Sequence, residues 1–130
     1  MNHSVARLLA HGRAAAAALM TDVCRIERTR VTTTDDGQDV EQVEALYEGR
    51  CRIRPSPQAA VDDLTGTALV ATWPYVVSVP LAVADVRAGD AVTVTTSDDP
   101  SLTGLRLRVR SIDRGTQITA RRLGCEEVNR

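Results

Sequence analysis

The sequence predicts a mainly β protein, a small six-stranded antiparallel β-barrel preceded by one N-terminal α-helix. Apolar residues recur with helical spacing only before position 20. After it, short runs of alternating apolar and polar residues are separated by clusters of turn-forming residues. A chain of 130 residues has the size of one domain, and closure into a barrel removes the exposed edges of such short strands. We therefore expect a helix over residues 1–20 and a barrel domain over residues 21–130.

The expected helix covers residues 2–20. Ser4 is suited to cap its N-terminus, and Gly12 weakens its centre by up to about 1 kcal/mol relative to alanine. An alanine-rich helix buries little area per residue, so we expect it to lie on a surface, either its own barrel or a neighbouring subunit. The apolar residues that fall near one stripe are Val5, Leu8, Leu9, Ala16, Leu19 and Met20.

Two strands are expected to form a hairpin over residues 21–54. In the first, over residues 21–34, Cys24 and Ile26 alternate with charged neighbours, which is typical of a strand with one solvated face. Residues 35–39 contain an Asp-Gly pair, which supplies the positive φ that a hairpin turn requires. The return strand is expected over residues 40–54.

A break in the sheet is expected over residues 55–66, because proline cannot donate a hydrogen bond to a strand ladder. This segment has the longest stretch without a strand pattern, and it is either a plain surface connection or a functional loop. A third strand is expected over residues 67–79, in which Pro74 implies an edge position or a bulge. Trp73 and Tyr75 flank this proline and are expected to anchor the core.

The most regular pattern lies in residues 89–127, which predict three strands joined by two turns. Val92 and Val94 mark the first strand, and Leu107 and Val109 mark the second. In the third, apolar residues occupy even positions at Ile118 and Ala120 but odd positions at Leu123 and Cys125, so regular alternation would point the two pairs to opposite faces. We therefore expect a β-bulge near Arg121-Arg122 to restore the register.

The choice of basic residues is unusual, because the sequence contains arginine and no lysine. The net charge of −1 argues against a protein that binds nucleic acid or membranes through a broad positive field. Each of two arginine ladders is either a solvated barrel face or a contact with acidic neighbours or nucleic-acid phosphates. The ladders lack interleaved aromatic residues, so stacking on single-stranded nucleic acid is poorly supported. The first ladder is Arg50, Arg52 and Arg54, and the second is Arg106, Arg108 and Arg110.

No catalytic or metal-binding pattern is found. Cys24, Cys51 and Cys125 are widely spaced and lie in apolar runs, which favours buried thiols in a reducing compartment. There are no close-set Cys or His pairs for zinc, no glycine-rich phosphate loop and no Ser-His-Asp arrangement. We predict that the protein is not an enzyme and has no catalytic residues, metal or cofactor. No apolar run approaches the ~20 residues of a membrane span, so no membrane partner is expected.

Several short motifs occur in a fixed order along residues 21–128. In that order they resemble a family of actinobacteriophage and prophage head-to-tail connector proteins of the stopper type. The motifs consist of strand and turn residues and contain no catalytic signature. They are Cys24-Arg25-Ile26, Tyr47-Glu48-Gly49-Arg50-Cys51-Arg52-Ile53, Pro74-Tyr75-Val76-Val77-Ser78-Val79-Pro80, Gly89-Asp90, Asp99-Pro100-Ser101-Leu102-Thr103-Gly104, Val109 and Ala120-Arg121-Arg122-Leu123.

The resemblance implies a virion protein, made in the host cytoplasm, that forms a twelve-fold or six-fold ring in the phage neck. The ring would contact a head-side adaptor, a tail-terminator protein and the double-stranded DNA in its channel. A channel loop that helps retain DNA corresponds, by position alone, to residues 55–66. The two arginine ladders are the candidate contacts with a neighbour or with DNA. The loop candidates are Pro55, Ser56, Pro57, Gln58, Asp62 and Asp63.

Two other functions are compatible with the pattern. A tail-tube or tail-completion subunit shares the barrel and the ring assembly. A cellular OB-like barrel could bind nucleic acid through the arginine ladders.

Overall fold

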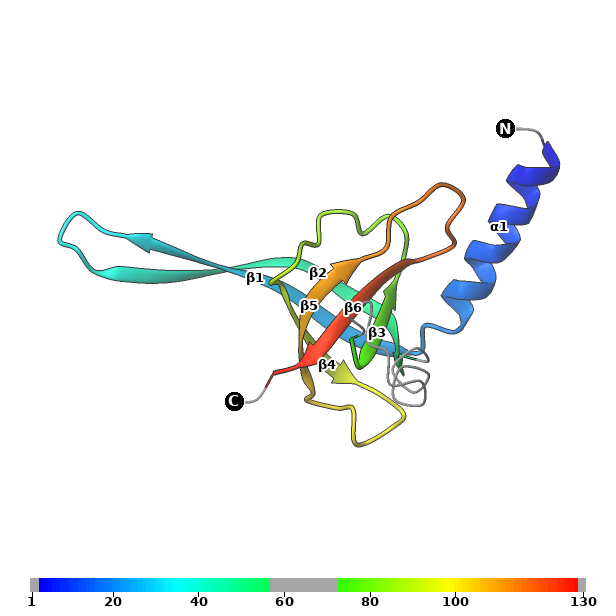
Figure 1. The fold of residues 1–130 in the computed structure, drawn as a ribbon. Helices are drawn as coiled ribbons and strands as arrows, with labels where there is room; N and C mark the ends of the chain where they lie inside the picture. The colour runs from blue at the N-terminus through cyan, green and yellow to red at the C-terminus, as the bar shows by residue number, and fades with distance from the viewer. Residues whose placement is uncertain (1–2, 57–72, 129–130) are drawn as a thin grey trace, which may run out of the picture.

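The computed structural model describes residues 3–56 and 73–128 of the chain. One helix precedes six strands that close into an antiparallel barrel, so the predicted fold class is confirmed (Figure 1). The elements are α1 (His3–Ala18), β1 (Asp22–Thr33), β2 (Asp39–Pro55), β3 (Tyr75–Val79), β4 (Ala91–Thr96), β5 (Arg106–Ile112) and β6 (Arg121–Glu127).

The strand order around the barrel is β1-β2-β3-β6-β5-β4. Each strand is antiparallel to both of its neighbours, and the pairing of β1 with β4 closes the sheet. The order places β2 and β5 three positions apart in either direction. They therefore form opposite walls of the barrel.

The barrel interior is filled by small aliphatic and thiol side chains, since the sequence has no phenylalanine. Alternation along the strands directs these side chains inward, as the sequence predicted for β1, β2, β4 and β5. They leave the charged residues between them on the outside. The buried cluster consists of Cys24, Ile26, Cys51, Ile53, Val77, Val79, Val86, Val92, Val94, Leu107, Val109, Leu123 and Cys125.

The bulge expected near Arg121-Arg122 is wrong. The register between β5 and β6 shifts on β5, between Val109 and Ser111, so Arg110 is the extra residue. The strand β6 begins only at Arg121, and the parity change that suggested a bulge there marks the end of the preceding turn. A single residue inserted in β5 thus keeps both Val109 and Leu123 inside the barrel.

The third strand is shorter than expected within the described residues. The first six residues of the expected range, 67–72, lie outside them, and Pro74 precedes β3 instead of interrupting it. The carbonyl oxygen of Pro74 accepts a hydrogen bond from Ser56 N at 2.9 Å. Tyr75 packs against the core as expected. Trp73, in contrast, lies close to Gly124, whose position between two inward residues of β6 places it on the outer face.

The helix α1 lies beside the barrel, on the side away from the long β1–β2 hairpin (Figure 1). Leu9 is its buried residue, and Met20 in the connection to β1 is also buried. Gly12 gives close access to the barrel, because a Cβ there would lie 2.7 Å from Thr119 Cγ2. Leu8 and Leu19 are exposed, so the barrel of the same chain covers only part of the apolar stripe of the helix.

Gly124→Ala should destabilise the barrel, because the added Cβ would lie 2.8 Å from Trp73 Cδ1 and would also meet the Ser111 hydroxyl. We expect a loss of about 1–3 kcal/mol in the free energy of unfolding, measured by urea denaturation. Gly115→Ala is the matched control, since its Cβ would make an ordinary 3.5 Å contact with Ile118. Equal stability of the two variants would contradict the close packing at Gly124.

Candidate functional site

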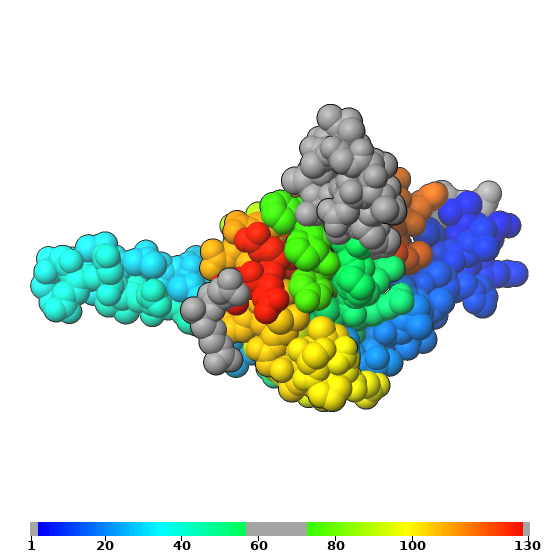
Figure 2. Space-filling view, turned by 60° about the horizontal axis from the view of Figure 1, so that its bottom comes forward, coloured from blue at the N-terminus to red at the C-terminus, as the bar shows by residue number. Residues whose placement is uncertain are grey.

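The most conspicuous feature outside the barrel is the distal part of the β1–β2 hairpin, residues 29–45, which we call the arm. The strands β1 and β2 have 12 and 17 residues, whereas the other four have five to seven. Every residue of the arm is exposed, and it projects well beyond the rest of the molecule (Figures 1 and 2). From position 29 to the turn it extends about 20 Å.

The arm is regular and ordered by its own hydrogen bonds. Cross-strand pairing continues without a shift from Arg28 opposite Glu44 to Thr33 opposite Asp39. At the turn, Thr34 N donates to Gln38 O at 2.8 Å, and Gly37 adopts a φ of 81° that favours glycine. The predicted Asp-Gly turn is therefore confirmed in position.

Two exposed valines lie close together on one face of the arm, which they share with Asp39 and Glu41. Val31 and Val43 are 60% and 57% exposed, and the register places them as diagonal neighbours on the same face. The other face carries an ion pair between Arg30 and Glu44, with Nη2 and Oε2 3.2 Å apart. Exposed valines on an ordered extension suit an arm that lies against a neighbouring molecule.

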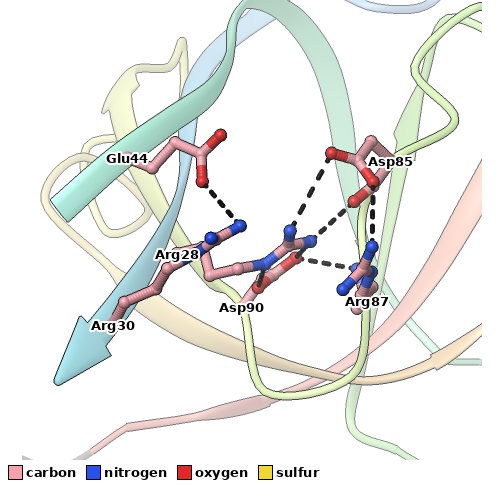
Figure 3. Close-up of polar contacts among 6 residues, drawn as sticks. All are labelled: Arg28, Arg30, Glu44, Asp85, Arg87 and Asp90. Carbon is pink, nitrogen blue, oxygen red and sulfur yellow. Dashed lines mark hydrogen bonds and ion pairs between the residues drawn. The ribbon is translucent and has the colours of Figure 1, made fainter. Parts of the chain in front are cut away.

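The base of the arm is fixed by an ion pair between Arg28 and Asp90 (Figure 3). Arg28 Nε and Nη2 donate to the two carboxylate oxygens of Asp90 at 2.9 and 3.0 Å, which is a bidentate geometry. Arg28 Nη2 also donates to Asp85 O at 2.7 Å. Hydrogen bonding to Asp90 raises the pKa of Arg28, so its positive charge is secured.

Asp90 connects this ion pair to the remainder of the barrel end. Its side chain is 3% exposed and accepts a 2.7 Å hydrogen bond from Arg87 N. Its carbonyl oxygen accepts from Val109 N on β5, and Gly89 N, at a φ of 99°, donates to Val109 O. The turn at residues 87–90 therefore joins β1, β4 and β5 at one end of the barrel.

A hollow beside this turn is rich in arginine, and we call it the arginine hollow. Its volume is about 480 Å³. Within the described part of the chain, the guanidinium groups of Arg106 and Arg108 have no acidic partner, and Arg87 has only a distant one in Asp85, at 3.7 Å. The lining residues are Glu27, Arg28, Thr29, Arg87, Ala88, Gly89, Asp90, Ala91, Arg106 and Arg108.

The two predicted arginine ladders are not brought together, because β2 and β5 form opposite walls. Arg52 and Arg54 are half-buried and line a cavity of about 270 Å³ beside α1, whereas Arg50 is exposed. On β5, Arg106 and Arg108 enter the arginine hollow. The third residue of that ladder, Arg110, instead pairs with Glu126 on β6.

The predicted channel loop lies largely outside the described residues, including Pro57, Gln58, Asp62 and Asp63. Of its other members, Pro55 ends β2 opposite Tyr75, and Ser56 is held to Pro74 by its backbone. The prediction for this loop therefore stays a prediction.

The three cysteines are fully buried free thiols, as the sequence predicted. Burial raises the pKa of Cys125 to about 12. The pKa of Cys51 is also raised, first by its hydrogen bond with Cys24 and then by burial. Cys51 and Cys125 are therefore protonated at neutral pH, which is the unreactive form of a thiol.

In residues 3–56 and 73–128, no group of three His, Cys, Asp or Glu side chains could hold a metal ion. None of the described helices is long and apolar enough to cross a membrane.

The arm and the Arg28–Asp90 pair were missed as functional features by the sequence reasoning. Two signals were present. The alternating pattern of the first hairpin is longer than a small barrel needs, and Arg28 follows Cys24 and Ile26 at an inward-facing position. A charged side chain on the inward-facing side of a strand requires a buried partner of opposite charge, and for Arg28 this partner is Asp90.

Comparison with known proteins gives a family and a fold. A family model described as a family of unknown function, DUF6093, matches residues 12–126. No curated protein matches the chain. The solution structure of protein SF1141 from Shigella flexneri 2a is similar, with a TM-score of 0.64 and 16% sequence identity, over 83% of this chain and 92% of that chain. At this identity the likeness concerns the fold alone.

Asp90→Ala should destabilise the protein, because it leaves Arg28 without its carboxylate and removes the acceptor of Arg87 N. We expect a loss of about 2 kcal/mol or more in urea denaturation, since the lost carboxylate is almost fully buried. Glu44→Ala, which breaks the exposed pair with Arg30, should change stability by less than about 0.5 kcal/mol. A loss for Glu44→Ala as large as that for Asp90→Ala would contradict the distinction.

The buried thiols give a prediction about labelling and pH. A thiol-specific disulfide reagent at pH 7 should modify Cys24, Cys51 and Cys125 only as fast as the protein unfolds. Because the folded pKa values of Cys51 and Cys125 are raised, their full contribution to stability should be present below about pH 8.5. Stability should fall at higher pH, as these two thiols ionise in the unfolded chain. Rapid labelling of all three thiols in the folded protein would contradict this account.

Proposed function

The chain belongs to the DUF6093 family, whose function is unknown, and we propose that it is a structural subunit of a tailed-phage neck. In this proposal it is a head-to-tail connector of the stopper type. Copies form a ring between a head-side adaptor and a tail-terminator protein, and the ring helps retain packaged DNA. Its place is the virion, and it carries out no catalysis.

The observation that carries the proposal is the arm. A closed barrel offers no unpaired sheet edge to a neighbour, so association has to use other surfaces. Here the chain extends an ordered hairpin about 20 Å away from its own core, with Val31 and Val43 exposed on one face. Such an extension adds nothing to the barrel core, and it suits a subunit that reaches onto its neighbour. The resemblance of the motifs in residues 21–128 to stopper proteins supports the same role.

The nucleic-acid-binding alternative has weaker support. Its two arginine ladders lie on opposite walls, and two of the three arginines of the first ladder line the cavity beside α1. A continuous basic track would need both ladders on one face. The tail-tube alternative shares the barrel and the ring, and it is separated from the neck protein by its number of copies in the particle.

Deletion of the gene from a tailed phage or prophage that encodes this chain tests the proposal. We expect heads and tails to assemble but not to join, and heads to lose DNA, as counted by electron microscopy. Supplying the chain from a plasmid should restore joined, infectious particles. Fully joined and viable particles without the chain would sink the proposal.

A shortened arm gives a second test. Replacing residues 31–41 by an Asn-Gly turn joins Arg30 to Gln42 and leaves the barrel and the Arg28–Asp90 pair in place. We expect the urea unfolding midpoint to change little, while joining of heads to tails is lost in the complementation assay. Full complementation by the shortened chain would show that the arm has no part in assembly.

A further inference from the structure

We propose that the acidic tip of the arm in one copy of the chain binds the arginine hollow of a neighbouring copy. The inference rests on the proposed ring assembly, because it names the two surfaces through which copies would join. It follows from the chemistry of these surfaces and from their separation within one molecule.

The tip of the arm is strongly acidic. Positions 31–42 contain four carboxylates, those of Asp35, Asp36, Asp39 and Glu41, and no basic residue. All four are exposed. The turn is held by its backbone, and Thr33 Oγ1 donates to Asp39 at 2.9 Å, so the carboxylates are presented on an ordered scaffold. Little ordering entropy would be lost when such a tip binds.

The arginine hollow has the complementary charge. Arg28 is neutralised by Asp90, and Glu27 is paired with Arg25 at 2.5 Å, so the cations left over are Arg87, Arg106 and Arg108. The last two have no acidic partner within the described residues. Planar guanidinium groups with free donors bind carboxylates in bidentate fashion, and this gives both attraction and orientation.

The tip cannot reach the hollow of its own molecule. The hollow lies at the base of the arm, beside Arg28, and the tip is about 20 Å away along a continuously paired hairpin. Figure 1 shows the hairpin pointing away from the barrel. Binding between two different surfaces of identical chains is heterologous, and it generates a ring when the rotation closes.

Nucleic-acid phosphates have the same charge as these carboxylates and are the competing occupant. The net charge of −1 and the opposite placement of the two ladders disfavour a broad attraction to DNA. The acidic partner, in contrast, is supplied by the chain itself. A second copy is therefore the occupant that the observations favour.

Disulfide trapping between full-length copies tests the contact. One chain carries Gln38→Cys at the tip, and the other carries Ala88→Cys in the hollow, both exposed positions. The native cysteines are fully buried, so only the introduced thiols should react. At low ionic strength we expect the mixed dimer to form at least about ten-fold faster than with Ala14→Cys, an exposed position on α1, in place of Ala88→Cys. High salt should reduce this difference.

Charge reversal makes the test specific. Arg106→Glu with Arg108→Glu in the hollow chain should lower the trapping rate to the control level, and so should Asp35→Arg with Asp36→Arg in the tip chain. Combining the two reversed chains should restore fast trapping. These side chains are exposed and have no ion-pair partner in the described structure, so urea midpoints should stay unchanged.

Three results with the purified chains would overturn the inference. They are trapping no faster than the Ala14→Cys control, reversed chains that trap as fast as the originals, and a hollow whose charge reversal abolishes binding of double-stranded DNA without affecting trapping. A phage that joins heads to tails normally with the reversed hollow would also refute it and would leave the connector function standing. The gene deletion described above tests that function separately.

Discussion

The ion pair between Arg28 and Asp90 is the interaction on which the shape of this molecule depends. It lies where β1 leaves the barrel, at the next inward-facing position after Ile26. An apolar residue at this position would extend the core. The arginine ends the core instead, and its charge is paired with the buried carboxylate of Asp90. Since Asp90 also binds the turn beside β5, the direction of the arm is tied to the barrel wall.

A second buried aspartate performs a similar task at the other end of the barrel. Asp22, at the start of β1, accepts hydrogen bonds from the Ser97 hydroxyl at 2.7 Å and from Ile53 N at 3.3 Å. It thereby joins β1 to β2 and to the chain that leaves β4. The small interior between the two ends consists of aliphatic and thiol groups, so these polar contacts add directionality that apolar packing does not provide.

Much of the fold could be predicted from the sequence, because alternation reports directly which side chains face a core. Cys24, Ile26, Val92, Leu107 and Val109 were all placed correctly. The bulge was misplaced, because an inserted residue shifts the parity of everything after it. The sequence pattern allows the inserted residue to lie in β5 or in β6. The observed pairing of the two strands shows that it is Arg110 in β5.

The candidate site was harder to predict, because it depends on contacts between distant parts of the chain. Arg28 and Asp90 are 62 positions apart, and neither ion-pair partner is implied by a local motif. The arginine ladders were recognised as ladders. The surroundings of each ladder could not be predicted, because they depend on the strand order. That order separates β2 from β5 and places Arg106 and Arg108 beside the turn at Gly89.

The number of copies of this chain in purified, DNA-filled phage particles tests the central claim most directly. Quantitative mass spectrometry against the major capsid protein would measure it. The proposed neck ring predicts a fixed number per particle, six or twelve in the rings that the resemblance implies. Absence of the chain from the particles, or a copy number that scales with tail length as in a tail tube, would contradict the account.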